Sequence, residues 1–200
     1  MEITTIIKYY KMLHRLKIND LNVLNKTLQV LEEGGIIVYP TDTIYGFGCD
    51  ALNKNAIKKL NLIKERIQPM SVLCPNIKTG LSWLNLEDDE KIYAKTKLTK
   101  GHTIIAPVNK NIVSRLIMGK NHSLGIRIPN HKFCKNISNN YINPITTTSV
   151  NKTGEEPHTD PNEIEKRFKG QLNLLIDDGI ITGKGSAIHH YKSKKWVKIR

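Results

Sequence analysis

The sequence is poor in cysteine, aromatic residues and acidic residues, and it contains no long hydrophobic run. Its three cysteines, Cys49, Cys74 and Cys134, lie far apart and form no C-x-x-C pair. This spacing argues against a disulfide framework and a structural zinc site, and it favours a reducing compartment in which cysteines pack as small apolar residues. Because no apolar segment is long enough for a membrane span or a signal-peptide core, we expect a cytoplasmic protein that does not partner a membrane.

The scarcity of acidic residues leaves a large positive charge. Thirty-one lysines and arginines stand against 18 aspartates and glutamates, which gives a formal net charge of +13. Such a charge favours polyanionic partners such as nucleotides or RNA. Aromatic residues make up only 6% of the chain, so the base-stacking surfaces typical of single-strand binders are not expected. With 39% hydrophobic residues, the composition is that of a globular protein.

Hydrophobic periodicity predicts a single α/β domain with a mixed sheet over residues 1–200, in which residues 1–11 are a candidate N-terminal extension. Helices are predicted after Asn19 or Asp20 (with Leu21, Leu24, Leu28 and Leu31 inward), around residues 56–63, over residues 87–98, and after Asp160. Strands are predicted at residues 14–18, 36–38, 71–74, 103–106, 123–129, 145–151, 172–176, 186–189 and 196–199.

The segment GGIIVYPTDTIYGFGCD, residues 34–50, is the centre of this pattern. Ile36, Ile37 and Val38 form a short apolar run typical of a strand buried on both faces. Pro40 has no backbone donor, so regular strand pairing is expected to end there. Hydroxyls and a carboxylate follow directly, as in a small-molecule crevice at a strand end. On local chemistry alone, the alternative of a strand followed by an ordinary polar turn stays open.

Two further strands end in polar groups. In SLGIRIP, alternation places Ser123, Gly125 and Arg127 on one face, where the glycine is expected to leave open space for a ligand. In ITTTSVN, the same alternation places Thr147, Ser149 and Asn151 on a common side. Strands seldom bury an unpaired arginine, which favours a functional role for Arg127. For Ser149 and Asn151 the alternative of ordinary turn residues stays open.

These segments, in this order, resemble the threonylcarbamoyl-AMP synthase family, also called the YrdC-like domain. The matching pieces are YPTDTIYGFGCDA, the K-x-R of Lys64 and Arg66, PMSVL, GIRIP, TTSVNKTGEEP and DPNEI. They cover the chain from about Leu16 to Arg200. The resemblance implies a twisted mixed sheet with flanking helices and an open, basic concave face, without the C-terminal extension of some members.

The resemblance also implies an activity. Members condense L-threonine, bicarbonate and ATP to threonylcarbamoyl-AMP and pyrophosphate, and a downstream threonylcarbamoyl transferase uses the product to modify tRNA. The implied threonine-binding residues are Thr43, Arg127 and Thr147. The implied nucleotide-binding residues are Lys64, Arg66, Ser123, Ser149, Asn151 and Arg200, of which Lys64 and Arg66 are also the implied catalytic pair. Mg²⁺ is expected with ATP, held mainly by phosphates and water.

Departures from the family pattern keep other functions open. The loop Arg66-Ile67-Gln68-Pro69 is shorter than usual and lacks a second lysine. One alternative is a diverged member that acts on a related nucleotide. Another is a non-catalytic module for tRNA or double-stranded RNA, to which weak binding is expected in any case. Lys64-Glu65-Arg66 could also be only a solvated helix end. The remaining candidates, His102, His189 and His190, are expected to be surface residues because their spacing fits no metal site.

Overall fold

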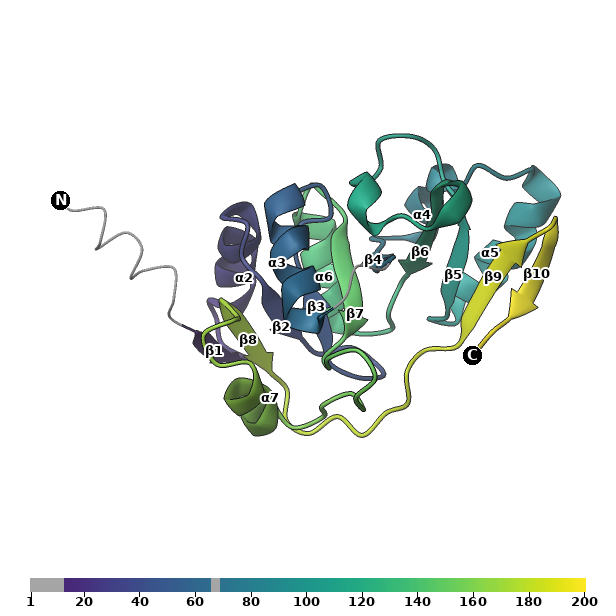
Figure 1. The fold of residues 1–200 in the computed structure, drawn as a ribbon. Helices are drawn as coiled ribbons and strands as arrows, with labels where there is room; N and C mark the ends of the chain where they lie inside the picture. Colours follow the sequence, from purple (N-terminus) through teal and green to yellow (C-terminus); the bar gives the residue numbers. More distant parts are fainter. Residues whose placement is uncertain (1–12, 66–68) are drawn as a thin grey trace.

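The structure, a computed structural model, describes residues 13–65 and 69–200. These residues form one α/β domain with a ten-stranded mixed sheet (Figure 1). Its strands are β1 (His14–Lys17), β2 (Ile37–Tyr39), β3 (Gly46–Gly48), β4 (Ser71–Leu73), β5 (Thr103–Pro107), β6 (Ser123–Arg127), β7 (Ile145–Ser149), β8 (Leu174–Asp177), β9 (Ile188–Lys192) and β10 (Lys195–Lys198). Its α-helices are α2 (Val23–Glu32), α3 (Lys54–Lys64), α4 (Ile77–Trp83), α5 (Asp88–Thr99), α6 (Lys132–Asn140) and α7 (Pro161–Arg167).

The strands lie in the order β1-β8-β2-β3-β7-β4-β6-β5-β9-β10. Strand β7 joins the two halves of the sheet, because it pairs antiparallel with β3 on one side and with β4 on the other. After β8 the chain crosses from one half to the other before it enters β9 (Figure 1). The central strands are thus assembled from segments that are distant in the sequence, and their polar ends can meet.

Two hydrophobic cores cover opposite faces of the sheet. In β2, Val38 packs into the core that includes Ile57 and Leu60 of α3, whereas Ile37 packs into the core that includes Leu31 of α2 and Ile137 of α6. This follows from the period of two in a strand. All three cysteines are free and buried, as the sequence predicts. No helix within residues 13–65 or 69–200 is long and apolar enough to cross a bilayer.

Most predicted elements are confirmed, and three were missed. Strand β3, GFG, is too short and rich in glycine to register as a strand, and it forms only because β2 and β7 flank it. Helices α4 and α6 are polar and short, so their apolar faces gave no long periodic signal. The predicted closing strands are shifted to β9 and β10, which form a hairpin through a left-handed turn at Ser193 and Lys194.

The start of the first predicted helix was wrong. Helix α2 begins at Val23 with Asn22 as its N-cap, not directly after Asn19 or Asp20. The Asp20 carboxylate instead accepts a hydrogen bond from the Asn22 backbone at 2.7 Å and closes a turn before the helix. Leu21, predicted to face inward, is 98% exposed because it lies in that turn. By contrast, Asp160 caps α7 as predicted and accepts from the Asn162 N–H.

Candidate functional site

A polar cavity of about 490 Å³, here the first chamber, opens on the sheet where β3, β4, β5, β6 and β7 meet. Five of the predicted site residues line it, and they come from four segments of the chain, because Thr147 and Ser149 both lie on β7. These are Thr43, Arg127, Thr147, Ser149 and Arg200. The polar strand ends predicted from the sequence therefore do converge on one cavity.

The β2–β3 loop forms one wall of the first chamber. The Thr41 hydroxyl accepts from the backbone N–H groups of Thr43 and Ile44 and donates to the Ile44 carbonyl at 2.7 Å. It also lies 3.1 Å from the Thr43 hydroxyl. At the end of the loop, the Tyr45 hydroxyl donates to the Gly179 carbonyl, which ties the loop to the β8–β9 connection. These bonds hold the Thr43 hydroxyl in a fixed position on the cavity wall.

Arg127 lies at the end of β6 and is only 5% exposed. Its Nε donates to the Gly101 carbonyl at 3.0 Å, and its Nη2 donates to the Asp42 carboxylate at 2.7 Å. Asp42 also accepts from the Asn130 backbone N–H. One side of the guanidinium is thus fully used, while Nη1 has no hydrogen-bond partner among the described residues. The remaining edge, Nη1 with the second proton of Nη2, can still grip a carboxylate through two parallel bonds.

The space next to Gly125 is shared between a protein side chain and a cavity. Gly125 pairs with Ser71 of β4, and a Cβ atom at Gly125 would lie 2.2 Å from the Ser71 hydroxyl. The glycine therefore makes room for Ser71, and it also borders a cavity, as the open space predicted from the sequence requires. Ser71 itself lines the first chamber. Its hydroxyl becomes one of the polar groups on the cavity floor.

Lys64, at the last turn of α3, is 1% exposed. Its ammonium donates to the Ser149 carbonyl at 2.6 Å, the Asn151 carbonyl at 2.8 Å and the Asn151 side chain at 3.2 Å. It also lies 5.4 Å from the ring centroid of Phe47. These contacts tie the end of β7 to α3. A direct contact between Lys64 and a phosphate would require some of them to be exchanged.

The segment after β7 folds around this lysine. The Ser149 hydroxyl lies 2.5 Å from the Asn151 side-chain oxygen, and the Asn151 amide donates to the Glu155 carbonyl at 2.7 Å. The predicted strand ends at Ser149, so Asn151 lies outside the sheet and does not line the first chamber. Its amide is used to shape the loop that follows.

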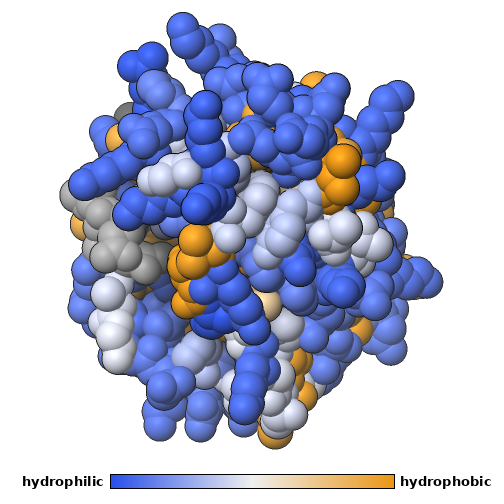
Figure 2. All heavy atoms as spheres, turned by 90° about the vertical axis from the view of Figure 1, so that its right-hand side faces the viewer, coloured by the Kyte–Doolittle hydropathy of each residue, from blue (hydrophilic) through white to orange (hydrophobic). Residues whose placement is uncertain are grey.

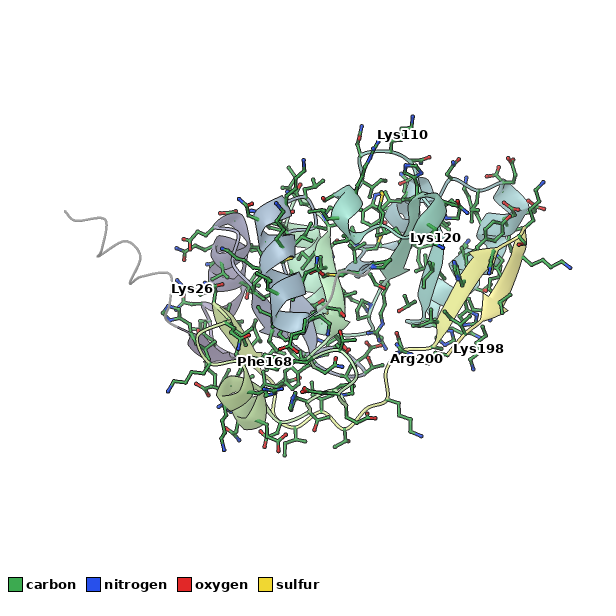
Figure 3. All side chains as sticks on the ribbon, in the orientation of Figure 1. Lys26, Lys110, Lys120, Phe168, Lys198 and Arg200 are labelled. Carbon is green, nitrogen blue, oxygen red and sulfur yellow. The ribbon has the colours of Figure 1, made fainter. Side chains whose placement is uncertain are left out.

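The C-terminal segment brings a second guanidinium to the chamber. Arg200 donates from Nε to the Ser186 carbonyl at 2.9 Å (Figure 3). Burial, together with repulsion from Arg127, lowers the pKa of Arg200 below its usual value. The β8–β9 connection packs closely over the opposite wall, since a Cβ atom at Gly183 would lie 1.9 Å from the Thr43 carbonyl. Two arginines facing one cavity favour an anionic ligand.

A second chamber of about 740 Å³ adjoins the first. The two share a wall made of Pro69, Met70, Ser71 and Ile105. Ser123, predicted to bind nucleotide, lines this second chamber and not the first. Of the predicted nucleotide residues, Ser149 and Arg200 line the first chamber and Ser123 lines the second, whereas Lys64 and Asn151 line neither. Arg66 lies outside the described residues.

Other lining residues were not predicted from the sequence. The first chamber also contains Thr103 and Ser186, whose hydroxyls lie 2.8 Å apart, and Glu156, the one carboxylate among its described lining residues. Thr103 begins a predicted strand, but its place opposite Arg127 depends on the pairing of β5 with β6, which the sequence alone does not show. Glu156 belongs to the GEEP segment, which is part of the family resemblance. It lies in a loop, where no periodicity indicates which way its side chain points.

The surface prediction for His189 was wrong. His189 is 4% exposed, and it forms hydrogen bonds to the Tyr93 hydroxyl at 2.9 Å and to the His102 ring at 3.0 Å. It is buried because β9 pairs with β5, and α5 covers that pair. No metal-binding group of three His, Cys, Asp or Glu side chains occurs in the part of the chain that the structure describes.

Among curated proteins, the chain is similar to the uncharacterized protein YciO of Escherichia coli K12. The two are 27% identical over 170 residues, which cover 83% of this chain and 82% of the relative. A Haemophilus influenzae protein is 26% identical over 163 residues, covering 80% of this chain and 79% of that protein.

Solved structures agree on the fold. The crystal structure of E. coli YciO matches with a TM-score of 0.81 at 22% identity and covers 95% of both chains. The P. abyssi Sua5 structure in complex with L-threonine matches with a TM-score of 0.83 at 22% identity over 94% of this chain, which spans 57% of that protein's length. Finally, residues 29–200 match the family model Sua5_yciO_yrdC, described as "Telomere recombination", so the chain belongs to the Sua5/YciO/YrdC family.

Proposed function

We propose that the protein is an L-threonylcarbamoyladenylate synthase, a nucleotidyltransferase that converts L-threonine, bicarbonate and ATP to threonylcarbamoyl-AMP, pyrophosphate and water. The observation that carries this proposal is the first chamber, where hydroxyls of Thr43 and Thr147 share one cavity with two guanidiniums. A site for threonine must accept a carboxylate, hold a hydroxyl and leave the amine accessible. The chamber offers groups of these kinds.

Threonine binds with its carboxylate on the unused edge of Arg127. Asp42 and Gly101 fix the plane of the Arg127 guanidinium. The side chain therefore loses little rotational freedom when the ligand binds. The hydroxyls of Thr43 and Thr147 lie on neighbouring walls, where they can bond the threonine hydroxyl and amine. The amine, once deprotonated, captures CO₂ derived from bicarbonate, and the carbamate oxygen then attacks the α-phosphorus of ATP. The bond to the β,γ-diphosphate breaks, and pyrophosphate leaves.

ATP, bicarbonate and the carbamate formed from threonine are all anionic, so charge neutralisation and positioning are expected to supply most of the catalysis. Arg200 neutralises the α-phosphate, and the Ser149 hydroxyl bonds the nucleotide from β7. Magnesium would reduce the charge of the phosphates. The residues fit this arrangement, because Glu156 is a single available carboxylate and Mg²⁺ in phosphate sites needs only one or two carboxylates.

Two structural relatives support the proposal by what they bind. P. abyssi Sua5 was crystallised with L-threonine. Full-length HypF, solved in a phosphate- and nucleotide-bound form, contains a region of the same fold, with a TM-score of 0.77 at 16% identity over 88% of this chain. We infer that the concave face of this fold accommodates both an amino acid and a nucleotide. The product would pass to a threonylcarbamoyl transferase that modifies tRNA.

The test is a direct assay of the purified protein with ATP, L-threonine, bicarbonate and Mg²⁺. We expect threonine-dependent release of pyrophosphate and an adenylated threonine carbamate detected by mass spectrometry. A folded protein that gives no product above the blank without threonine would contradict the proposal. In that case, activity on a related nucleotide becomes the better account.

Weak RNA binding is a second candidate function, favoured by the β9–β10 hairpin. Lys192, Lys194, Lys195 and Lys198 are all exposed there, and none forms an ion pair with a described residue. Figure 2 shows that this side of the molecule is mainly hydrophilic, with only scattered hydrophobic patches. We expect binding to tRNA or double-stranded RNA whose affinity falls steeply with salt. A tight, salt-resistant complex would instead favour the RNA-binding module as the main role.

A further inference from the structure

The second chamber carries a charge that the proposed reaction does not yet use. Its described lining includes Lys120 and Lys192 and no aspartate or glutamate. Both lysines are exposed, and neither forms an ion pair with a described residue. Other lysines near acids do pair, as Lys17 does with Asp177 at 2.7 Å. A cavity edged by two unpaired ammonium groups favours an anion.

Strand register places this charge on the same face as the first chamber. Thr103 of β5 pairs with Arg127, whereas Pro107 pairs with Ser123 at the other end of β6. On the far side of β5, Ile105 pairs with His190 of β9, so alternation puts Lys192 on the same face, two residues further along. The face thus has a cationic end at Arg127 and another beside Ser123, separated by four residues or roughly 13 Å.

The backbone that carries these lysines is held in a costly conformation. Lys120 directly precedes Asn121 and His122, whose φ angles are 56° and 54°. Lys192 directly precedes Ser193 and Lys194, whose φ angles of 51° and 58° are those that the two-residue turn of the β9–β10 hairpin requires. Left-handed backbone at residues other than glycine is unfavourable. These turns hold Lys120 and Lys192 on two flanks of the second chamber.

The turn that bears Lys120 is also tied to a predicted nucleotide residue. The Gly119 N–H donates to the Ser123 carbonyl at 2.8 Å, which closes the turn over residues 119–123. A Cβ atom at Gly119 would lie 2.5 Å from the Ser123 hydroxyl, so glycine is needed for this close approach. Lys120 and Ser123 therefore belong to one closed turn.

We propose that Lys120 and Lys192 form a second anion subsite, which binds the terminal phosphates of the nucleotide while Arg127 binds the threonine carboxylate. A single small anion cannot reach both cationic ends of the face, but a substrate pair with an anion at each end can. The identity of the nucleotide rests on the proposed function. The subsite itself rests on charge and geometry, and a polyphosphate without a nucleoside tests it.

The test compares calorimetric titrations of inorganic tripolyphosphate, ATP, AMP and adenosine into wild-type protein, Lys120→Gln, Lys192→Gln and the double variant. The matched control is Lys110→Gln, which removes the same charge from an exposed residue that lines neither chamber (Figure 3). We expect the double variant to lose at least tenfold in affinity for tripolyphosphate and ATP, less than twofold for AMP, and nothing for adenosine. The control should behave as wild type.

Three results would overturn this subsite. The first is wild-type-like tripolyphosphate binding by the double variant, and the second is no tripolyphosphate binding by wild type. The third is an equal loss of affinity for adenosine and ATP, which would assign the second chamber to the nucleoside. Failure of the proposed function gives a different result. A protein that binds tripolyphosphate through these lysines but makes no threonylcarbamoyl-AMP would support the anion subsite and contradict the synthase activity.

Discussion

Lys64 and Arg127 are both buried cations beside the first chamber, but the structure holds them in different ways. The Lys64 ammonium contacts three neutral oxygens at the end of β7 and in the loop that follows. Arg127 is held by one carbonyl and by the carboxylate of Asp42. Lys64 has its three protons directed at protein atoms, whereas Arg127 keeps an unused edge.

This difference assigns a structural role to Lys64 and a ligand-binding role to Arg127. An ammonium has three donors, so three protein acceptors use its capacity in this state. A guanidinium has five, and two protein acceptors leave an edge for a ligand. We therefore expect Lys64 to affect function mainly by holding the loop that follows β7 in shape. We expect Arg127 to affect it mainly by contacting the substrate directly. The sequence interpretation had given both residues a direct role, and direct phosphate contact by Lys64 stays a prediction.

The largest effect is expected from Lys64→Met, which keeps the bulk of the side chain and removes the ammonium. The partly buried carbonyls of Ser149 and Asn151 would lose their donor, which should lower the free energy of unfolding by about 3 kcal/mol. Urea denaturation measures this loss. Lys58→Met is the matched control, because Lys58 is exposed on the same helix, and it should change stability by less than about 0.5 kcal/mol.

The same variant distinguishes the two roles of Lys64. If Lys64→Met is as stable as wild type but no longer binds ATP, the lysine acts on the phosphates and the comparison with Arg127 fails. If stability, ATP affinity and threonine affinity all decrease together, Lys64 acts through the structure of the loop after β7.

A smaller and more selective effect is expected from Arg127→Lys. An ammonium cannot reproduce two parallel bonds to a carboxylate, so threonine affinity should fall roughly ten- to a hundredfold, or about 1.5–3 kcal/mol. ATP affinity should stay nearly unchanged. Calorimetric titration of each ligand separates the two sites. Loss of ATP binding with normal threonine binding would contradict the assignment of this end of β6. Arg66→Lys, outside the described residues, is predicted to show the reverse pattern.

Asp42→Asn tests whether the carboxylate positions Arg127. The amide oxygen can still accept one hydrogen bond from Nη2, but the ion pair and one acceptor are lost. We expect threonine affinity to fall roughly threefold to tenfold, less than in Arg127→Lys, because the guanidinium remains but is held less firmly. Titration of threonine checks this. An unchanged affinity would mean that the Gly101 carbonyl alone orients Arg127.

The sequence was sufficient for the fold class and for the residues at strand ends. The patterns at Ile36–Val38 and Ser123–Arg127 are local. In a strand that alternates apolar and polar residues, the sequence alone shows which side chains share a face. This alternation singled out Arg127 and Thr147, whereas Thr43 and the threonine-binding role of all three residues came from the resemblance to the family. The convergence of their strands depends on β7 pairing with both β3 and β4, which no local pattern encodes.

The rest depends on contacts between distant segments. Asp42 and Arg127 are separated by 85 residues, so their pairing was not visible in the sequence. Ser71 occupies the space at Gly125 for a similar reason, through strand register. His189 was expected at the surface because its spacing fits no metal site, and that argument does not address burial. Its burial comes from α5 and β5, which are distant in sequence.

Two titratable groups, His102 and His189, lie next to the backbone that holds Arg127. They are expected to make the stability of this region depend on pH. Gly101, whose carbonyl holds Arg127, is followed by His102, and the His102 ring bonds to His189. Burial lowers the pKa of both histidines below the usual 6.5, and the charges of Lys97 and Lys198 lower them further. Lys100 and Arg127 add to this for His102, and the Tyr93 hydroxyl faces the other nitrogen of His189.

Because these pKa values are lower in the folded protein, the unfolded chain binds more protons on acidification. The histidine pair therefore contributes its full stability above about pH 6.5, and that contribution is lost as the pH falls below this value. We expect the melting temperature of wild type to decrease from pH 7.5 to 5, and the decrease to be smaller in a double variant, His102→Gln with His189→Gln. The pKa of Asp177 is lowered to about 2, so that carboxylate stays ionised throughout this range. An equal decrease in both proteins would show that groups other than this histidine pair carry the acid sensitivity.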